Sequence, residues 1–245
     1  MTELDGQVAI VTGSSSGIGE ATALRLSELG AHVVVNSWSS VDAGEAVAAA
    51  LPTEGMYVQA DIADQAQGHA LLERTIERFG RLDILVNNAG WTTVVPHHDL
   101  EGLTDDILRK TFEVNVFGTW WLTKAAMPHL RDSDSPCVVM VTSLAGTRPV
   151  GSSIAYAMSK AALNHLTLLL AKSCGPVRVN AVAPGLVETP WTSDWTAQHD
   201  FVRAVSPMHR SATPADCAEA VLGMVRNPHV TGQVLTVDGG SGLVM

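Results

Sequence analysis

Short apolar runs alternate with longer stretches of helical periodicity along this chain, and no other feature limits its fold as much. The runs that we expect to form strands are Val8–Val11, Val33–Val35, Tyr57–Gln59, Ile84–Val86, Val138–Val141, Val177–Val182 and Val234–Val237. The stretches that we expect to form helices lie near residues 18–29, 41–51, 64–79, 104–130, 155–173 and 213–226. Strands that alternate with helices are joined by right-handed crossovers. The sequence therefore predicts an α/β fold, a doubly wound parallel sheet with helices on both faces.

The bulk properties indicate one domain and exclude several classes of partner. No repeat, low-complexity tract or linker divides the chain, so we expect a single domain over residues 1–245. A net charge of −10 without a basic cluster argues against nucleic acid or an anionic membrane as a partner. No apolar run approaches the roughly 18 residues of a membrane span, and the acidic start Met1–Asp5 is unlike a secretory signal. The cysteines Cys137, Cys174 and Cys217 form no CxxC pattern, which is typical of reduced thiols in a cytoplasmic protein.

A glycine-rich turn follows the first expected strand and precedes the first expected helix. It reads TGSSSGIG over residues 12–19. Glycines let the backbone approach a pyrophosphate, whose charge the N–H groups at a helix start can bind. The spacing Gly-x3-Gly-x-Gly, with no lysine after it, favours a dinucleotide over a nucleoside triphosphate.

Tyr156 and Lys160 stand four residues apart within one expected helix, so their side chains are neighbours on one face. A fixed cation beside a phenol favours the phenolate. Lowering the phenol pKa by roughly 3 units would need about 4 kcal/mol of differential stabilisation. By itself the pair is more often an amphipathic helix face with the lysine in water.

Residues 183–212 form the longest stretch without a strong period. The stretch follows a strand end and contains Pro184, Pro190, Pro207, Trp191 and Trp195. Ligands of open α/β sheets bind at the carboxyl ends of strands, and a long segment there is typical of a lid over the substrate. The two tryptophans could instead pack beneath the segment or at a subunit contact, and both interpretations stay open.

Several motifs, spread in order over essentially the whole chain, resemble those of the short-chain dehydrogenase/reductase family in its shorter single-domain form. They are TGSSSGIG at 12–19, Asn87-Asn88-Ala89-Gly90, Asn115, Ser143, YAMSK at 156–160, Pro184-Gly185 with Thr189, Gly232, and Val237-Asp238-Gly239-Gly240. The resemblance implies a Rossmann-like sheet of seven parallel strands in the order 3-2-1-4-5-6-7. It also implies a homo-oligomer, a tetramer or a dimer, and the pair Trp120-Trp121 is expected in the core or at an interface.

The resemblance also implies a role for each motif. Tyr156 would transfer a proton to or from the substrate oxygen while hydride passes between the substrate carbon and the nicotinamide. Lys160 would lower the pKa of Tyr156 and hold the ribose hydroxyls, and Ser143 would bind the carbonyl oxygen. Asn115 would anchor a water that links Lys160 to solvent. The residues expected to bind the cofactor are Gly13, Ser15, Ser16, Gly17, Ile18, Gly19, Ser37, Trp38, Ser39, Asp61, Ile62, Asn88, Ala89, Gly90, Tyr156, Lys160, Pro184, Gly185, Val187 and Thr189. The residues expected to line the substrate pocket are Trp91, Ser143, Val150, Tyr156, Trp191 and Trp195.

Some polar residues have a simpler explanation. Asp61 could cap the helix that follows it, and Asn87 is expected to be structural rather than to bind the cofactor. His97-His98-Asp99 lacks spaced partner ligands, so we expect no metal site. His209 could reach the active site from the variable segment, although nothing requires it.

The end of the second strand bears on the choice between NAD and NADP. An acidic residue there binds the ribose 2′-hydroxyl of NAD, but this position is Ser37, and no acid follows before Asp42. The basic residue common in NADP-dependent relatives is also absent, both at Trp38 and at Ser16. The Ser37, Ser39 and Ser40 hydroxyls and the next helix start could bind a 2′-phosphate. We favour NADP(H) over NAD(H).

Together these observations predict an NADP(H)-dependent oxidoreductase that acts on a ketone or a secondary alcohol, like a carbonyl reductase or a 3-oxoacyl reductase. The acidity of the chain is unfavourable for an acidic acyl carrier protein, so a free carbonyl compound and a carrier-bound acyl group both stay open. One alternative is an NAD-dependent alcohol dehydrogenase of the same fold. Another is a catalytically silent dinucleotide sensor, which would be expected to lack Tyr156 or Lys160. Epimerases and dehydratases of the extended relatives would need a longer substrate domain than Gly240–Met245 provides.

Overall fold

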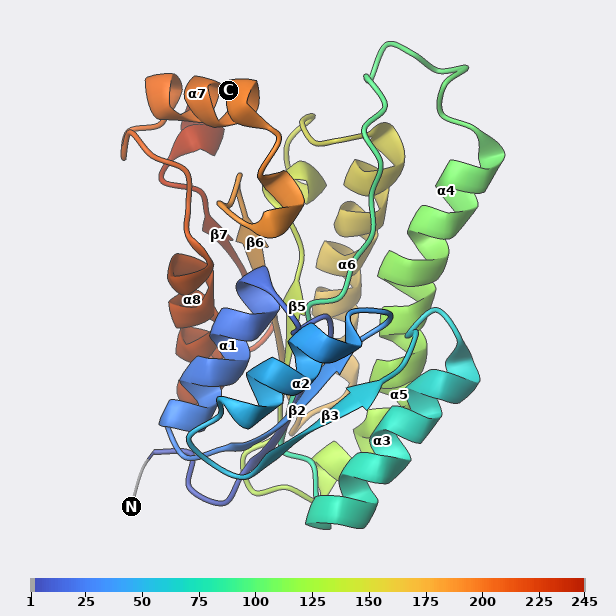
Figure 1. The fold of residues 1–245 in the computed structure, drawn as a ribbon, viewed down its shortest axis with the longest axis vertical. Helices are drawn as coiled ribbons and strands as arrows, with labels where there is room; N and C mark the ends of the chain where they lie inside the picture. Colours follow the sequence, from blue (N-terminus) through green and yellow to red (C-terminus); the bar gives the residue numbers. More distant parts are fainter. Residues whose placement is uncertain (1–2, 245) are drawn as a thin grey trace.

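The computed structural model describes residues 3–244, and all seven expected runs form strands of one parallel sheet (Figure 1). The strands are β1 (Val8–Val11), β2 (His32–Ser37), β3 (Gly55–Gln59), β4 (Ile84–Asn87), β5 (Cys137–Val141), β6 (Arg178–Pro184) and β7 (Val234–Val237). Their order is β3-β2-β1-β4-β5-β6-β7. The predicted fold class and strand order are therefore confirmed.

Strands β1 and β4 meet at the centre of the sheet, where the strand order reverses. Ala9 lies opposite Ile84, and the Asp83 carboxylate accepts a hydrogen bond from the Val8 N–H at 2.8 Å. Ligands of such sheets bind at this reversal point, outside the carboxyl ends of the strands.

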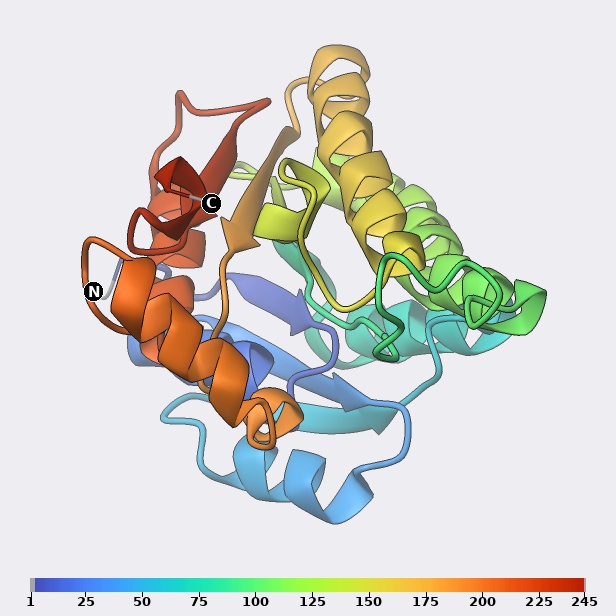
Figure 2. The same cartoon turned by 90° about the horizontal axis from the view of Figure 1, so that it is seen from above.

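Helices cover both faces of the sheet, as Figure 2 shows from above. The face covered by α1 (Gly17–Glu28), α2 (Val41–Ala49) and α8 (Pro214–Arg226) has a core that includes Val11, Val33, Ala23, Val47 and Leu222. The opposite face is covered by α3 (Gln65–Phe79), α5 (Thr119–Arg131) and α6 (Ile154–Ser173), and its core includes Ile10, Leu85, Leu71, Leu122 and Leu170. Because successive strand residues point to opposite faces, both cores draw on the same continuous apolar runs.

The single helix expected at residues 104–130 consists of three parts. Helix α4 (Asp105–Phe112) begins after the N-cap Thr104, a π-helical turn spans Glu113–Gly118, and α5 continues to Arg131. At Gly118 a Cβ would collide with the Ile62 carbonyl oxygen, so the helix passes directly against the connection after β3. Wide turns of this kind are frequent at functional sites.

The segment at residues 183–212 is more ordered than its sequence predicts. It contains a short 3-10 helix at Pro190–Thr192 and the α-helix α7 (Thr196–Val205), which the sequence analysis did not predict. Helix α7 buries only His199 and Val202, so its apolar stripe is too short to stand out as a helical period. Over residues 3–244, no helix combines the length and apolar character that crossing a membrane requires.

Candidate active site

A cleft of about 1120 Å³ lies at the carboxyl ends of the strands. Its walls are the glycine-rich loop after β1, the ends of β2, β4 and β5, the start of α6 and the segment after β6. Every residue expected to bind the cofactor lines it except Gly19, which lies beneath the loop. Of the expected catalytic residues, Ser143, Tyr156 and Lys160 line the cleft, whereas Asn115 does not.

The glycine-rich loop packs tightly against the loop after β4. Gly13 has a φ of +61°, and a Cβ at this position would lie 2.8 Å from the Ala89 Cα. The Asn88 side-chain amide donates to the Thr12 and Gly13 carbonyls at 2.8 and 2.9 Å. A Cβ on Gly19 would collide with the Gly13 carbonyl oxygen. The N-cap Ser16 makes no side-chain capping bond, so the first N–H groups of α1 face the cleft with capacity for an anion.

The end of β2 forms the next wall, and its polar groups are only partly engaged. The Ser37 hydroxyl donates to the Ser40 carbonyl at 3.1 Å and shares a hydrogen bond of 2.8 Å with the Tyr57 hydroxyl. Ser40 is the N-cap of α2 but makes no capping bond with its side chain. Trp38 is 61% exposed at the rim.

Asp61 does not cap the following helix. The N-cap of α3 is Asp64, whose carboxylate accepts from the Ala66 and Gln67 N–H groups. Asp61 instead accepts from the Ala63 N–H at 2.9 Å and lines the cleft. The capping interpretation of Asp61 is therefore wrong.

Tyr156 and Ser143 form the centre of the reactive end. Helix α6 begins after the N-cap Ser153, whose hydroxyl accepts from the Tyr156 N–H at 3.1 Å. This cap places the phenol one turn into the helix, beside the Ser143 hydroxyl. Burial raises the pKa of Tyr156 to about 12, and its hydrogen bond with Ser143 opposes that shift. The phenol is thus a proton donor in this arrangement.

Lys160 is buried and its ammonium donates to the Val141 carbonyl at 2.9 Å. The ammonium lies 5.6 Å from the centroid of the Tyr156 ring, and burial lowers the pKa of Lys160 to about 8. The charge of Lys160 does not offset burial at the Tyr156 phenol, whose pKa stays above its ordinary value. Desolvation is the largest contribution at both groups, although Tyr156 is only half-buried, and each pKa shift favours the neutral form.

These two opposite shifts predict a characteristic pH dependence of stability. The native pKa of Lys160 is about 8 against an ordinary 10.5, so between these values the unfolded chain binds more protons and stability rises with pH. The native pKa of Tyr156 is about 12 against 10, so stability falls between pH 10 and 12. We expect the free energy of unfolding in urea to rise from pH 8 to 10 in the unmodified protein and to lose this rise in Lys160→Met. An equal slope in both proteins would contradict the assigned burial.

The Asn115 side-chain amide is hydrogen-bonded to Trp91 and Ser159. Its Oδ1 accepts from the Trp91 N–H at 2.7 Å, and its Nδ2 donates to the Trp91 carbonyl at 3.0 Å and to the Ser159 hydroxyl at 2.9 Å. The π-helical turn presents this side chain to the loop after β4, where it fixes the backbone of Trp91. Asn87 is also structural, as expected: it is buried and donates to the Thr123 hydroxyl at 2.9 Å.

The segment after β6 covers the reactive end. A Cβ on Gly17 would lie 3.2 Å from the Thr189 methyl group, so the segment touches the glycine-rich loop. The Trp191 ring reaches the opposite wall, where its Cη2 lies 3.8 Å from the Cβ position of Gly90. Trp91, Val150, Trp191 and Trp195, expected in the substrate pocket, all line the cleft.

Comparison with known proteins identifies the family. A family model described as enoyl-(acyl carrier protein) reductase matches residues 13–242. The chain is 53% identical over 244 residues to a protein named ketoacyl reductase 2 of the granaticin polyketide synthase from Streptomyces violaceoruber, with 98% of each chain covered. It is 35% identical to a 3-oxoacyl-[acyl-carrier-protein] reductase from Synechocystis sp., again over 98% of each chain. The chain belongs to the short-chain dehydrogenase/reductase family.

Solved structures agree with this assignment. A short-chain dehydrogenase from Burkholderia cenocepacia in complex with NADP has a TM-score of 0.91 and 36% identity, over 98% of this chain and 99% of that one. A 3-ketoacyl-(acyl-carrier-protein) reductase from Brucella melitensis complexed with NADH has the same TM-score and 32% identity, with the same coverage. This short-chain dehydrogenase/reductase is thus an enzyme that uses a nicotinamide dinucleotide and acts on C=O and CH–OH groups.

The residues of this short-chain dehydrogenase/reductase fit a dinucleotide. Gly13 and Gly19 have no room for side chains, which brings the backbone of the loop to the floor of the cleft. At the other end, the Cβ position of Gly90 lies 3.6 Å from the Lys160 ammonium, so the backbone of Gly90 runs directly beside that ammonium. The two ends suit a pyrophosphate and a ribose respectively.

Three residues of the cleft and its cover escaped the sequence analysis. Lys110 of α4 lines the cleft, and its ammonium lies 4.6 Å from the Trp91 ring centroid and 5.9 Å from that of Trp38. Phe201 of α7 lines it on the side of Trp195, and His199 is buried inside the cover. Lys110 precedes Val114, another cleft residue, by one helical turn. This spacing places both side chains on one helix face and could have indicated that Lys110 lines the cleft.

His209 and the three cysteines lie outside the reactive end of the cleft. His209 has a φ of +52° and does not line the cleft. Between residues 3 and 244, no three His, Cys, Asp or Glu side chains are placed to hold a metal ion together. Cys137, Cys174 and Cys217 are free thiols, and burial raises the pKa of Cys137 to about 11 and that of Cys217 to about 12.

Proposed function

We propose that this enzyme is an NADPH-dependent ketoreductase that reduces the ketone of a bulky, largely apolar ketoacyl substrate. The arrangement of Ser143, Tyr156 and Lys160 beneath an apolar and aromatic wall carries the proposal. That wall includes Val94, Val95, Pro96, Val150, Trp191, Trp195 and Phe201. The relatives named as ketoacyl and 3-oxoacyl reductases support this substrate class.

The chemistry follows from the protonation states of the site. The nicotinamide, when bound, supplies the hydride. Ser143 donates a hydrogen bond to the substrate carbonyl and orients it, and the neutral phenol of Tyr156 gives its proton to the carbonyl oxygen as negative charge develops there. Lys160 holds the ribose hydroxyls next to Gly90, and its positive charge stabilises the phenolate that the proton transfer leaves. Asn115 acts indirectly by fixing the backbone of Trp91.

A preference for NADPH is supported by the end of β2. Ser37 stands where an acidic residue would repel a 2′-phosphate, and α2 begins beside it with the Ser40 hydroxyl outside any capping bond. Across the cleft, Lys110 adds a cation next to Trp38 and forms no ion pair within the described part of the chain. The other lysine of the cleft, Lys160, lies at the nicotinamide end.

Turnover with matched cofactors and substrates tests the proposal. We expect faster reduction with NADPH than with NADH at equal concentration, and higher kcat/KM for bulky 3-oxoacyl thioesters than for small free ketones, followed by nicotinamide absorbance. A clear preference for NADH would overturn the cofactor assignment. A lack of activity on every ketoacyl compound, with activity on simple alcohols, would favour the alcohol dehydrogenase alternative.

Replacing Lys110 by methionine should weaken NADPH binding about tenfold and leave NADH binding nearly unchanged. One lost charge-assisted contact to a phosphate is worth about 1.5 kcal/mol, close to a factor of ten. Calorimetry with both cofactors measures the effect. Arg109→Met, the adjacent cation on the same helix but outside the cleft, is the matched control. Equal weakening of both cofactors would contradict a role for Lys110 at the 2′-phosphate.

We further propose that residues 1–245 act as one domain, with residues 183–212 as its lid, and that two or four copies associate. Several large apolar side chains of the π-helical turn, α5 and α6 are exposed, namely Phe117, Trp120, Met158, Leu168 and Leu169. Exposed apolar side chains on these neighbouring helices support a subunit interface. The free thiols support a place in the reducing cytoplasm.

A further inference from the structure

The two ends of the lid are hydrogen-bonded to each other, and a residue within the lid is bonded to the body of the protein. At its neck, the Glu188 N–H donates to the Ala212 carbonyl at 2.9 Å, and the Ala212 N–H donates to the Leu186 carbonyl at 3.0 Å. Past the neck, the Ser206 hydroxyl donates to the Gly239 carbonyl at 2.9 Å. Between these points the lid lies over the cleft, where Thr189 approaches Gly17 and Trp191 approaches Gly90, and hydrogen bonds within the lid help to hold it there.

His199 is the buried side chain at the centre of those contacts. It is 7% exposed, and both ring nitrogens are engaged. Nδ1 lies 2.7 Å from the Ser211 hydroxyl and Nε2 lies 3.2 Å from the Thr192 carbonyl. Because a carbonyl only accepts, Nε2 carries the proton, and in the neutral ring Nδ1 accepts from Ser211. One imidazole thus joins α7 to both arms of the lid. The outgoing arm precedes α7 and contains Thr192, and the returning arm follows α7 and contains Ser211.

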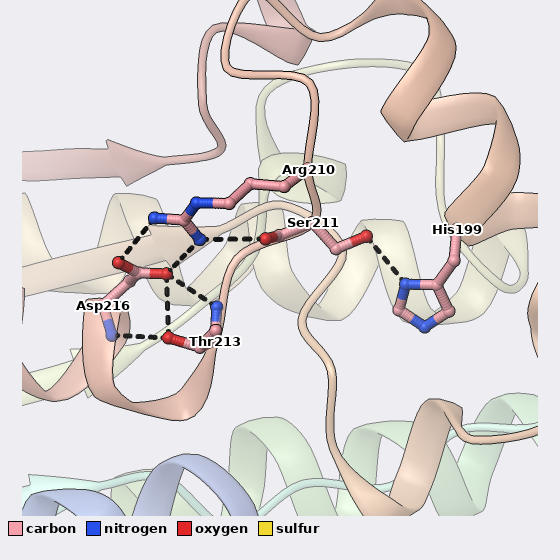
Figure 3. A network of polar contacts seen from close by, with 5 residues as sticks. All are labelled: His199, Arg210, Ser211, Thr213 and Asp216. Atoms are coloured by element: carbon pink, nitrogen blue, oxygen red, sulfur yellow. Dashed lines mark hydrogen bonds and ion pairs between the residues drawn. The ribbon is translucent and has the colours of Figure 1, made fainter.

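The returning arm is fixed to the first turn of α8, as Figure 3 shows. Arg210 donates to the Ser211 carbonyl at 3.0 Å and to both oxygens of Asp216 at 2.6 and 2.9 Å. Asp216 completes the capping box with Thr213. The Arg210 guanidinium holds the pKa of Asp216 well below its usual range, so this anchor persists across neutral and mildly acidic pH. Ser211 is therefore a hydrogen-bond partner of His199 whose own position is fixed.

The outgoing arm carries Trp191, the residue before Thr192. Its ring spans the cleft to Gly90, at the end where the Lys160 ammonium is open. In the proposed placement, the nicotinamide end of a complete dinucleotide meets this ring, whereas an adenosine nucleotide occupies only the other end of the cleft. The Thr192 carbonyl next to this ring accepts from the Trp195 N–H at 3.0 Å and from His199 at 3.2 Å, so His199 adds a side-chain bond to the backbone bond that holds this turn.

We propose that His199 is a positioning residue that holds Trp191 across the nicotinamide end of the cleft and so limits the rate of cofactor exchange. The inference rests on the proposed placement of the dinucleotide in this cleft. Removal of the two ring hydrogen bonds loosens the outgoing arm. The Trp191 indole then moves away from the nicotinamide end of the cleft more often. Association and release of the complete cofactor both become faster.

The test compares His199→Phe, which keeps a planar ring without hydrogen bonds, with His199→Gln, whose amide offers one donor and one acceptor. His229→Phe is the matched control, an exposed histidine outside the cleft. Stopped-flow tryptophan fluorescence measures the association and release of NADPH and of 2′,5′-ADP. Hydrogen–deuterium exchange follows the amides of residues 188–205.

In His199→Phe we expect both NADPH rate constants and the exchange of the lid amides to rise about tenfold, as expected for the loss of one to two hydrogen bonds. The rates for 2′,5′-ADP should stay unchanged, and His199→Gln should behave like the unmodified protein. Unchanged NADPH rates in His199→Phe would overturn the inference, and so would equal acceleration of 2′,5′-ADP or failure of glutamine to restore slow exchange. If His199→Phe does not fold, Ser211→Ala removes one of the two bonds and should raise the NADPH rates about threefold, and unchanged rates would again overturn the inference.

These measurements need no carbonyl substrate. Failure of the ketoacyl assignment would therefore leave the result for His199 intact, and NADH replaces NADPH if it binds more tightly.

Discussion

Replacing Tyr156 by phenylalanine should lower kcat for ketone reduction by about 10²- to 10⁴-fold, the usual contribution of a positioned general acid. The change removes only the hydroxyl, which is the one acidic group beside Ser143 that is neutral at working pH. The ring and its packing in α6 remain, so NADPH binding measured by calorimetry should change less than about threefold. The loss therefore belongs to the proton transfer rather than to cofactor affinity.

Tyr57→Phe is the control for this substitution, because Tyr57 is the second of the two tyrosines in the chain. Its hydroxyl contacts Ser37 near the adenosine end. We expect its effect on cofactor affinity alone, with kcat preserved. Carbonyl reduction at the normal rate in Tyr156→Phe would show that the phenol is not the acid, and the silent-sensor alternative would return if neither protein reduced any ketone.

Replacing Gly19 by alanine should destabilise the protein by about 2–3 kcal/mol and abolish measurable cofactor binding. A Cβ at this position collides with the Gly13 carbonyl oxygen and lies 2.7 Å from the Ser14 Cα. Backbone atoms cannot move aside as a flexible side chain can, so the loop must shift as a unit. Urea unfolding measures the stability, and calorimetry with NADPH measures the binding.

Gly68→Ala provides the opposite case within a helix. A Cβ on Gly68 meets nothing within 4 Å, so alanine should stabilise α3 by about 0.5–1 kcal/mol. Cofactor binding should be unchanged, because Gly68 lies outside the cleft. Equal stability and normal binding in Gly19→Ala would mean that the loop is not packed as described.

Most of the sheet could be predicted from the sequence because its strands are buried on both faces. Val8–Val11 and Val138–Val141 are uninterrupted apolar runs, and only a parallel sheet between two helical layers buries such runs completely. The glycine-rich loop and the pair Tyr156 and Lys160 were also visible, since each depends on residues close together in the sequence.

The rest of the site depends on contacts between distant segments. Lys110 lines the cleft because α4 brings it close to Trp38, the residue after β2. The role proposed for His199 depends on its hydrogen bonds with Ser211 and Thr192. The contribution of burial to the Tyr156 pKa could not be predicted for a similar reason. Spacing revealed the neighbouring cation, but the degree of enclosure, which decides the shift here, is a property of the whole fold.

The central position of β1 has a consequence for the growing chain. Its two neighbours in the sheet, β2 and β4, are both complete once Asn87 has been made, whereas β5, β6 and β7 come later. A nascent chain can therefore close the glycine-rich loop and the adenosine wall before Ser143, Tyr156 and Lys160 exist. Domains of this size often fold through partly formed states during synthesis. The residues proposed to bind the adenosine end of the nucleotide are therefore synthesised before those proposed to perform the reduction.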